Sequence, residues 1–141
     1  MPILIIRWQR LVDADGATCP RCQATRDALQ HAVARLDAAL RPQGIQPRLE
    51  ISELDATRFA AAPAESNRIW IAGQPLEHWL DARAGSSPCC AQCGPAACRT
   101  LEIGATSFDS VPEELLVRAG LRAAADLLAR EPGAPPAPAA G

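Results

Sequence analysis

Two cysteines separated by two residues, Cys19 and Cys22, are the positions of this sequence best suited to chemistry. They stand in the segment Thr18-Cys19-Pro20-Arg21-Cys22, where an apolar stretch gives way to a pattern typical of an amphipathic helix. Three residues make about one helical turn, so both sulfurs are expected near one face, within reach of a disulfide or of a shared metal ion. The spacing therefore predicts thiol chemistry.

The local sequence indicates which cysteine reacts. Thr18 suits an N-cap and Pro20 suits the first helical turn, so Cys19 is expected beside unpaired backbone N–H groups at the positive end of the helix. Such an environment stabilises a thiolate and can lower a cysteine pKa from about 8.5 to between about 3.5 and 7.5, and Arg21 adds to this effect. We predict Cys19 as the catalytic nucleophile and Cys22 as the resolving thiol.

Four further cysteines are gathered in one Gly/Pro-rich stretch, between Ser86 and Cys98. In one interpretation they form a second thiol pair that relays oxidising equivalents. In another they hold a soft thiophilic ion such as Cu(I), Hg(II) or As(III), because thiolates favour soft metals. The predicted ligands of that ion are Cys89, Cys90, Cys93 and Cys98.

A zinc site is an alternative that uses both groups of cysteines. Two Cys-x2-Cys pairs supply four thiolates, the ligand number of a tetrahedral Zn²⁺ site, and Gly94 provides a tight turn after the second pair. The alternative set is Cys19, Cys22, Cys90 and Cys93. No cofactor is required by the sequence, and zinc or a soft thiophilic metal are the candidates.

Length and composition restrict the class of protein to which this chain can belong. The chain has 141 residues, 48% of them hydrophobic, a net charge of −2 and a pI near 5.6. The length and the hydrophobic content predict one domain, over residues 1–130, and the order of its predicted strands and helices makes it α/β. It carries a cysteine-rich insertion at about 84–99, and the Pro/Ala-rich tail at 131–141 is predicted to be disordered. The acidic balance and the few aromatic residues argue against nucleic acid as a partner.

The N-terminal residues indicate where in the cell the protein is expected. Residues 1–7 lack a basic lead-in and a long apolar run, so they predict neither a signal peptide nor a membrane span. We expect a cytoplasmic protein without a membrane partner. In a reducing compartment six cysteines indicate redox or metal chemistry rather than a static disulfide framework.

The first half of the chain predicts a strand, a helix and a parallel strand. Residues 3–8 are almost uniformly apolar, which is typical of a central strand buried on both faces. Residues 48–54 alternate and predict a half-covered strand. Between them a helix ends near 41–44, and its apolar face consists of Leu29, Val33, Leu36 and Leu40.

The second half predicts a hairpin and a closing helix. Residues 68–72 are strand-like, Gly73-Gln74-Pro75 is a turn, and Leu76–Leu80 is interpreted as the returning strand. That arrangement brings the cysteine-rich loop to the sheet end that holds Cys19 and Cys22, whereas a helical 76–80 allows the two groups to lie apart. The closing helix begins at a capping box over residues 110–113, and its apolar face consists of Leu116, Ala119, Ala123 and Leu127.

This order of elements, with a Cys-Pro-x-Cys pair opening the first helix, resembles the thioredoxin fold and its glutaredoxin-like members. More closely, the chain resembles an uncharacterised bacterial family of cysteine-rich, thioredoxin-like domains of unknown function. The resemblance implies a central mixed sheet, built from a βαβ unit, a β-hairpin and a C-terminal helix. The matching segments are 8–13, 18–22, 66–71, 86–90 and 114–120.

One position departs from the thioredoxin pattern. Redox-active members usually carry a cis-proline just before the strand that corresponds to residues 68–72, and this chain has Ser66-Asn67-Arg68 there. The departure argues against generic exchange of protein disulfides. Arg68 could pair an anionic substrate near Cys19, although an exposed strand end is the simpler interpretation.

Thiol–disulfide oxidoreductase chemistry by Cys19 and Cys22 is our first interpretation. The expected partner is a small thiol-reactive or metalloid substrate, or a redox partner protein. The alternative is a non-catalytic metal-binding protein, and a third class is an interaction module whose zinc only holds the loop. His31 and His78 are interpreted as surface residues of a helix and of a strand, because neither has a cysteine or histidine partner at metal-ligand spacing.

Overall fold

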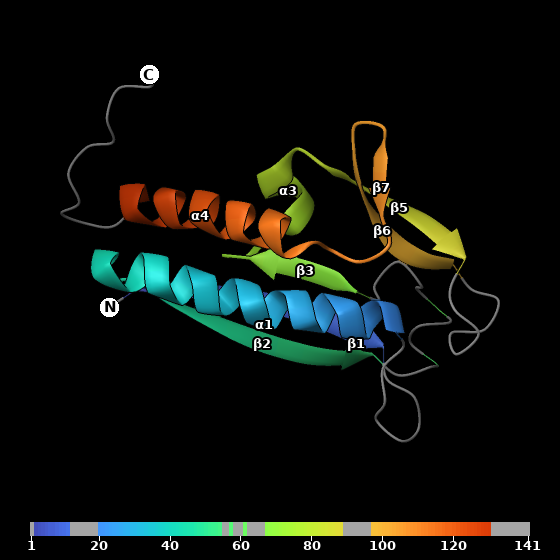
Figure 1. Cartoon of the computed structure of the whole chain (residues 1–141), viewed down its shortest axis with the longest axis horizontal. Helices are drawn as coiled ribbons and strands as arrows, with labels where there is room; N and C mark the ends of the chain where they lie inside the picture. Colours follow the sequence, from blue (N-terminus) through green and yellow to red (C-terminus); the bar gives the residue numbers. More distant parts are fainter. Residues whose placement is uncertain are drawn as a thin grey trace.

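A strand, a helix and a second strand open the fold (Figure 1). The computed structural model describes residues 2–11, 20–54, 67–88 and 97–130, together with Thr57 and Ala61. The first three long elements are β1 (Ile3–Leu11), α1 (Pro20–Leu40) and β2 (Gln46–Leu54). β1 and β2 pair in parallel, which confirms the predicted strand–helix–strand unit.

The end of α1 lies where the sequence predicted it. Leu29, Leu36 and Leu40 are buried, so the apolar stripe of the helix faces the core. A short 3-10 turn, η1 (Arg41–Gln43), follows the helix, and Gly44 adopts a φ of 80°. Glycine tolerates this left-handed conformation without strain, which lets the chain turn back into β2.

The hairpin region differs from the prediction. β3 (Arg68–Ile71) is followed by a two-residue strand, β4 (Gln74–Pro75), and then by a short helix, α3 (Leu76–Leu80). The predicted strand at 76–80 is therefore wrong, and so is the strand position of His78. Leu76 and Leu80 are both buried, so the four-residue spacing of the helix turns both side chains toward the core.

The first four strands form one mixed sheet in the order β2-β1-β3-β4. β1 is parallel to β2 and antiparallel to β3, and β3 is antiparallel to β4. β1 thus lies inside the sheet, as its apolar sequence predicted. The predicted mixed α/β architecture is confirmed at this level.

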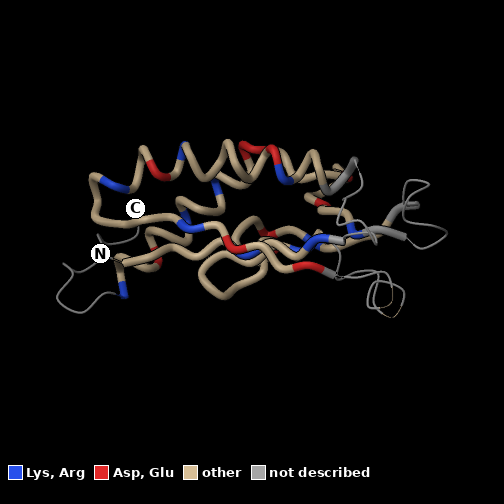
Figure 2. Tube along the Cα trace, turned by 90° about the horizontal axis from the view of Figure 1, so that it is seen from below, with Lys and Arg blue, Asp and Glu red and all other residues tan. Residues whose placement is uncertain are grey.

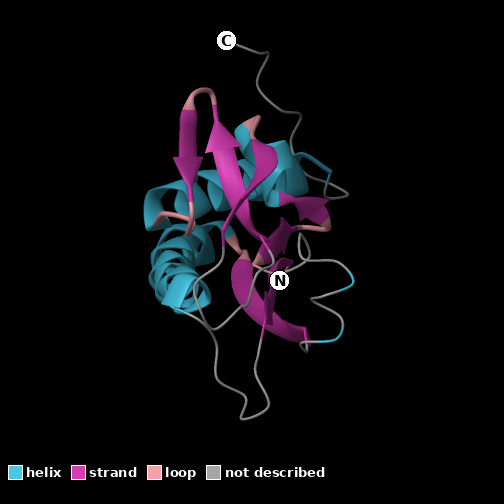
Figure 3. Cartoon of the chain, turned by 90° about the vertical axis from the view of Figure 1, so that its right-hand side faces the viewer, coloured by secondary structure: helices cyan, strands magenta, loops and turns pink. Residues whose placement is uncertain are grey.

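Helices cover one face of this sheet. α1 and α4 (Glu113–Arg130) pack beside each other on the same side of it (Figure 3), over the buried residues Leu4, Ile6 and Trp8 of β1. On the other face of β1, Ile3 and Ile5 are each 39% exposed. The expectation that this strand is buried on both faces is therefore wrong for the described residues.

A second, antiparallel sheet follows α3. It consists of β5 (Arg83–Pro88), β6 (Ala97–Ile103) and β7 (Thr106–Phe108), in that order. The described parts of the predicted cysteine-rich insertion are thus strands. Leu101 is 3% exposed and Phe108 packs against the core, so this sheet shares the hydrophobic core with the first.

The two long helices are joined by close packing and by charge. Gly120 of α4 lies against Leu36 of α1, and Arg35 of α1 bonds Glu113 and Glu114 at 2.8 Å each. Hydrogen bonds to Glu114 and Glu113 raise the pKa of Arg35 above its usual value. α4 is thereby fixed along α1, beginning from its first turn.

Charge and hydropathy of the described elements complete the description. Basic and acidic residues are interspersed along the chain (Figure 2). Among the described residues, no helix combines the length and the apolar character needed to cross a membrane.

Candidate functional site

The N-terminus of α1 carries one of the predicted active cysteines. The helix begins at Pro20, so the backbone of Cys22 lies in its first turn, and Cys19 directly precedes the helix but lies outside the described residues. The first turn contains no acidic residue. Because the N–H groups of a first helical turn have no intrahelical partner, this end favours an anion, and no carboxylate of the same turn opposes it.

Thr25 anchors the beginning of α1. Its side chain is fully buried, and its Oγ1 accepts a 3.4 Å hydrogen bond from the backbone N–H of Val111. Val111 stands two residues before α4, so the bond ties the cysteine-bearing turn of α1 to the segment that leads into α4. The position of Cys22 is thus set by the core one turn away.

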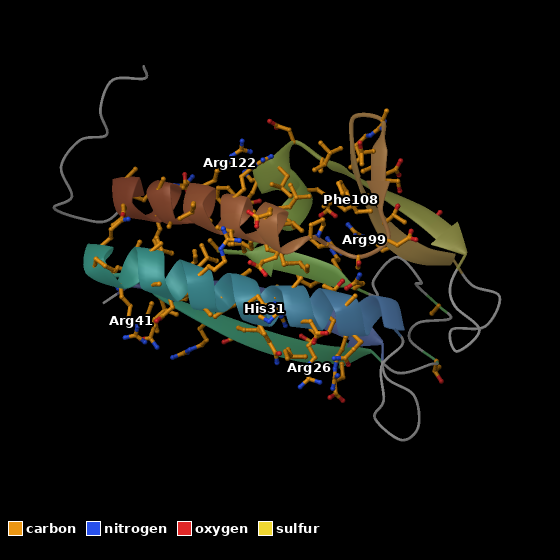
Figure 4. All side chains as sticks on the ribbon, viewed as in Figure 1. Arg26, His31, Arg41, Arg99, Phe108 and Arg122 are labelled. Atoms are coloured by element: carbon orange, nitrogen blue, oxygen red, sulfur yellow. The ribbon has the colours of Figure 1, made fainter. Side chains whose placement is uncertain are left out.

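Arg26 lies one turn beyond Cys22 on the same helix. Residues four apart are neighbours on a helix surface, with about 5–6 Å between their Cβ atoms. The Nε atom of Arg26 is buried and has no hydrogen-bond partner among the described residues. Arg26 thus brings a positive charge to the N-terminal half of α1 (Figure 4).

Asn67 occupies the place where the thioredoxin pattern has a cis-proline. Its φ is 57°, and no cis peptide bond occurs among the described residues. The side-chain Oδ1 of Asn67 accepts a 2.9 Å hydrogen bond from Nε1 of Trp8, which is fully buried. A left-handed asparagine fixed to the core therefore directly precedes β3, where the thioredoxin pattern has a proline.

The elements that adjoin the remaining cysteines reach the same end of the molecule. Figure 1 shows the end of β5 and the beginning of β6 at the end where β1 finishes and α1 starts. Cys98 is the second residue of β6 and its backbone pairs with Ser87 of β5, while Cys89 directly follows β5. Although 76–80 is helical, the two cysteine-bearing parts of the fold share this end.

The predicted ligand and catalytic sets are only partly placed. Cys22 and Cys98 lie in described elements, whereas Cys19, Cys89, Cys90 and Cys93 lie outside the described residues. The described part of the chain contains no group of three or more His, Cys, Asp or Glu side chains arranged to hold a metal. The complete metal sets and the Cys19–Cys22 geometry therefore stay predictions.

Two other residues considered from the sequence, His31 and Arg68, make ordinary contacts with their neighbours in the structure. His31 is 72% exposed on α1 and lies 3.4 Å from Glu113, which agrees with a helix-surface residue. Arg68 stacks over Trp70, with 4.6 Å from its guanidinium carbon to the ring centroid, and Arg7 approaches the same ring at 5.8 Å. Arg68 thus contacts an aromatic ring on β3 in this structure.

Sequence reasoning missed an ion pair beside Cys98. Arg99 of β6 donates to Glu77 of α3, with Nη2 and Nε lying 3.1 and 3.3 Å from Oε2. The side chains are only 13% and 16% exposed, respectively. Opposite charges 22 residues apart in different elements carry no local signal, so only the fold reveals the pair.

Comparisons with known proteins identify relatives without an assigned activity. Residues 4–120 match a family described as a domain of unknown function (DUF2703). A protein of Archaeoglobus fulgidus, named only as an uncharacterized protein, is 40% identical over 113 residues, which cover 80% of this chain and 82% of the relative. No solved structure matches. The predicted family of unknown function is confirmed, while its bacterial character stays a prediction.

Proposed function

Because the chain belongs to the family described as a domain of unknown function (DUF2703), we propose its activity from its own residues: it is a dithiol oxidoreductase-like protein that uses Cys19 and Cys22. The observation that carries the proposal is the position of the pair at the N-terminus of α1. Cys22 lies in the first turn and Cys19 directly precedes it. The helix dipole and the free N–H groups there stabilise a thiolate.

The order of elements supports a thioredoxin-like domain for this chemistry. The βαβ unit, the short β3–β4 hairpin and the closing helix α4 are the features on which the thioredoxin resemblance rests. The thiol pair follows the first strand, as the resemblance requires. We propose that the Trp8–Asn67 bond replaces the cis-proline in shaping the chain opposite the pair.

The proposed reaction proceeds by two thiolate attacks. The thiolate of Cys19 attacks one sulfur of a substrate disulfide, which forms a mixed disulfide and releases the other substrate sulfur as a thiolate. The thiolate of Cys22 then attacks the sulfur of Cys19 and releases the rest of the substrate. Two electrons pass to the substrate, and the protein is left with a Cys19–Cys22 disulfide. A dithiol partner reverses these steps and restores the reduced pair.

Alkylation as a function of pH tests the nucleophile. Full-length protein is treated with a limiting amount of iodoacetamide, and the modified cysteines are identified by mass spectrometry. We expect one fast-reacting thiol with a pKa below the usual value of about 8.5, lost in Cys19→Ser and kept in Cys22→Ser. Fast alkylation that survives Cys19→Ser would contradict the assignment.

A metal-binding protein is the second candidate. The specific observation in its favour is that β5 ends and β6 begins at the end of the molecule where α1 starts, so that Cys22 and Cys98 belong to two elements that both start at this end (Figure 1). Four thiolates suit tetrahedral zinc or a soft thiophilic ion. The candidate ligands are Cys19, Cys22, Cys90 and Cys93, or Cys89, Cys90, Cys93 and Cys98.

Metal content together with free thiols separates the two candidates. The protein is purified without added metal or chelator. About one zinc per chain with four protected thiols, and loss of the helical signal on chelation, would establish a closed structural site and exclude catalysis by Cys19. A metal-free protein with a reducible Cys19–Cys22 disulfide would support the oxidoreductase.

A further inference from the structure

Strand β2 lies at the edge of the described sheet. Its neighbour there is β1, and its other side forms the border of that sheet (Figure 1). β2 has nine residues, which is long for an edge strand. Because the outer side of an edge strand carries backbone N–H and C=O groups, a strand of another molecule can pair with it.

Alternate residues of β2 direct their backbone groups to this outer side. The N–H of Gln46 donates a 3.0 Å hydrogen bond to the oxygen of Pro2, so Gln46 faces β1. Successive residues of a strand turn these groups to opposite sides, so Pro47, Leu49 and Ile51 direct theirs away from β1. Pro47 has no N–H to leave unpaired, which is typical of proline in an edge strand. Leu49 and Ile51 thus supply donors to the outer side.

Two exposed charges of opposite sign lie on one face of β2. Arg48 and Glu50 are two residues apart, so their side chains point to the same face of the sheet. In the pairing with β1, Glu50 stands opposite Arg7, whereas Arg48 stands opposite Ile5. β1 therefore gives Glu50 a neighbour of opposite charge but gives Arg48 none.

The other face of β2 is apolar. Pro47 is buried and Leu49 packs against the core, but Ile51 is 45% exposed. Ile51 stands opposite the buried Trp8 of β1, so it lies on the face that the helices cover. A strand beside β2 would remove apolar surface of Ile51 from water, which favours association.

We propose that two copies of this chain pair through β2, antiparallel and centred on Leu49, to form one continuous sheet. A two-fold axis at Leu49 places Arg48 of one copy opposite Glu50 of the second copy, and the reverse. The two Leu49 residues exchange both backbone hydrogen bonds. Each Ile51 N–H donates to the Pro47 oxygen of the other copy. Ile51 then lies beside Pro47 of the other copy on the apolar face.

Neighbouring registers lack this charge complementarity. If the axis lies at Arg48 or at Glu50, that residue stands directly opposite its own counterpart, and like charges in this arrangement destabilise a sheet. If the axis lies at Ile51, Glu50 stands opposite Ser52 and gains no partner of opposite charge. The charges of β2 therefore select the register centred on Leu49.

The antiparallel arrangement also fixes where the two helix ends lie. α1 begins at the end of the molecule where β1 finishes, and β1 is parallel to β2 (Figure 1). Two antiparallel β2 strands therefore place the N-termini of the two α1 helices at opposite ends of the joined sheet. The pairing thus leaves the cysteine-bearing end of each copy separate, and it does not depend on the chemistry of those cysteines.

Molar mass and hydrogen exchange of the native chain test the pairing. Under reducing conditions, which exclude intermolecular disulfides, sedimentation from about 1 μM to about 1 mM should show the mass rising from 14.9 kDa to twice that value. The amides of Leu49 and Ile51 should exchange at least about tenfold more slowly at the high concentration. The amide of Glu50 faces β1 and should be protected at both concentrations, so it is the internal control.

Charge reversal tests the register. Arg48→Glu places two carboxylates opposite each other and Glu50→Arg places two guanidinium groups opposite each other. Each variant alone should therefore raise the dissociation constant of the dimer by about tenfold. An equimolar mixture of the two variants restores opposite charges across the interface and should associate more tightly than either variant alone. The double variant Arg48→Glu/Glu50→Arg should associate like the native chain.

A matched control is Arg83→Glu, which makes the same change in net charge as Arg48→Glu at an exposed position of β5. It should leave the dissociation constant unchanged. A native chain that stays monomeric, or a dimer without slower exchange at Leu49, overturns the proposal. A dimer that Arg48→Glu does not weaken overturns it as well. If a variant fails to fold, as judged by circular dichroism, the exchange of the native chain decides.

Discussion

The indole N–H of Trp8 donates a 2.9 Å hydrogen bond to the side-chain oxygen of Asn67, a residue 59 positions further along the chain. The bond joins the buried face of β1 to the residue that directly precedes β3. Asn67 has a φ of 57°, a conformation that asparagine tolerates better than most residues. The side chain of Asn67 thus fixes the backbone turn before β3. It also fixes the end of β1 that lies beside the cysteine-bearing end of the fold.

Replacing Asn67 should destabilise the protein through two separable effects. Asn67→Ala leaves the buried Trp8 N–H unpaired and places alanine in the left-handed region, so we expect a loss of about 2–4 kcal/mol in the free energy of unfolding. Asn67→Gly removes only the bond and should cost about 1–3 kcal/mol. Urea unfolding measures both variants. Equal stability of Asn67→Gly and the parent protein would show that the bond contributes nothing.

A second prediction concerns the contact between the long helices. A Cβ atom on Gly120 would lie 2.5 Å from Cδ1 of Leu36, a fully buried side chain. Gly120→Ala gains about 1 kcal/mol of helix propensity but must displace Leu36, so we expect a net loss of about 1–2 kcal/mol in thermal or urea unfolding. Leu36→Val in the same chain should recover part of this loss. A stabilised single variant would contradict the tight packing.

A third prediction concerns the second sheet. A Cβ atom on Gly85 of β5 would overlap Oε2 of Glu102 and lie 2.7 Å from Oγ1 of the buried Thr100, both on β6. We expect Gly85→Ala to accelerate hydrogen exchange in β5 and β6 while α1 keeps its protection. Glu102→Ala removes one of the two obstructing groups, so the double variant should be protected better than Gly85→Ala. Unchanged exchange in β6 after Gly85→Ala would refute the steric argument.

The sequence predicted those elements whose signal is local. The apolar stripe of Leu29, Leu36 and Leu40 has a helical period, Gly44 follows the end of that helix, and α4 begins at Glu113, the last residue of the stretch that predicted its start. The apolar run of β1 correctly indicated a strand inside the sheet. Its exposed residues Ile3 and Ile5 could not be foreseen, because an apolar run does not show which face a helix covers.

The misread segment, 76–80, shows where short patterns fail. Its two leucines stand four residues apart, a spacing that a helix places on one face and that a strand of five residues places on one face as well. Tertiary contacts favour the helix, since the indole of Trp79 reaches the backbone oxygen of Ile71. Local propensity does not contain that contact.

The sequence predicted where the cysteine-bearing helix begins but not the residues that hold this end of it. The cysteine spacing indicated thiol chemistry at a helix N-terminus, and α1 does begin at Pro20. The residues that hold this end, Thr25 and Asn67, act through partners 86 and 59 positions away in the chain. Pairings over such distances require the fold, because nothing near either residue in the sequence specifies its partner.

The last prediction assigns a role to Arg26, one turn beyond Cys22 on α1. A positive charge near a thiolate favours the ionised form, so Arg26→Gln should raise the pKa of the Cys22 thiol and slow its alkylation near neutral pH. Above the raised pKa the thiol is ionised in both proteins, so the difference in rate should vanish as the pH rises. The measurement is the rate of alkylation between about pH 5 and pH 10, a range that spans both pKa values.

Arg41 provides the matched control for Arg26. It lies in η1, directly after α1 and at the opposite end of that helix from Cys22, and Nε of Arg41 bonds Asp37 at 2.8 Å (Figure 4). Arg41→Gln removes the same charge from the protein, but at a distance where solvent and salt screen it. Both variants have the same net charge. A rise in the thiol pKa that occurs only in Arg26→Gln must therefore come from the proximity of Arg26 to the thiol. Equal shifts in both variants would instead indicate a general charge effect and remove Arg26 from the site.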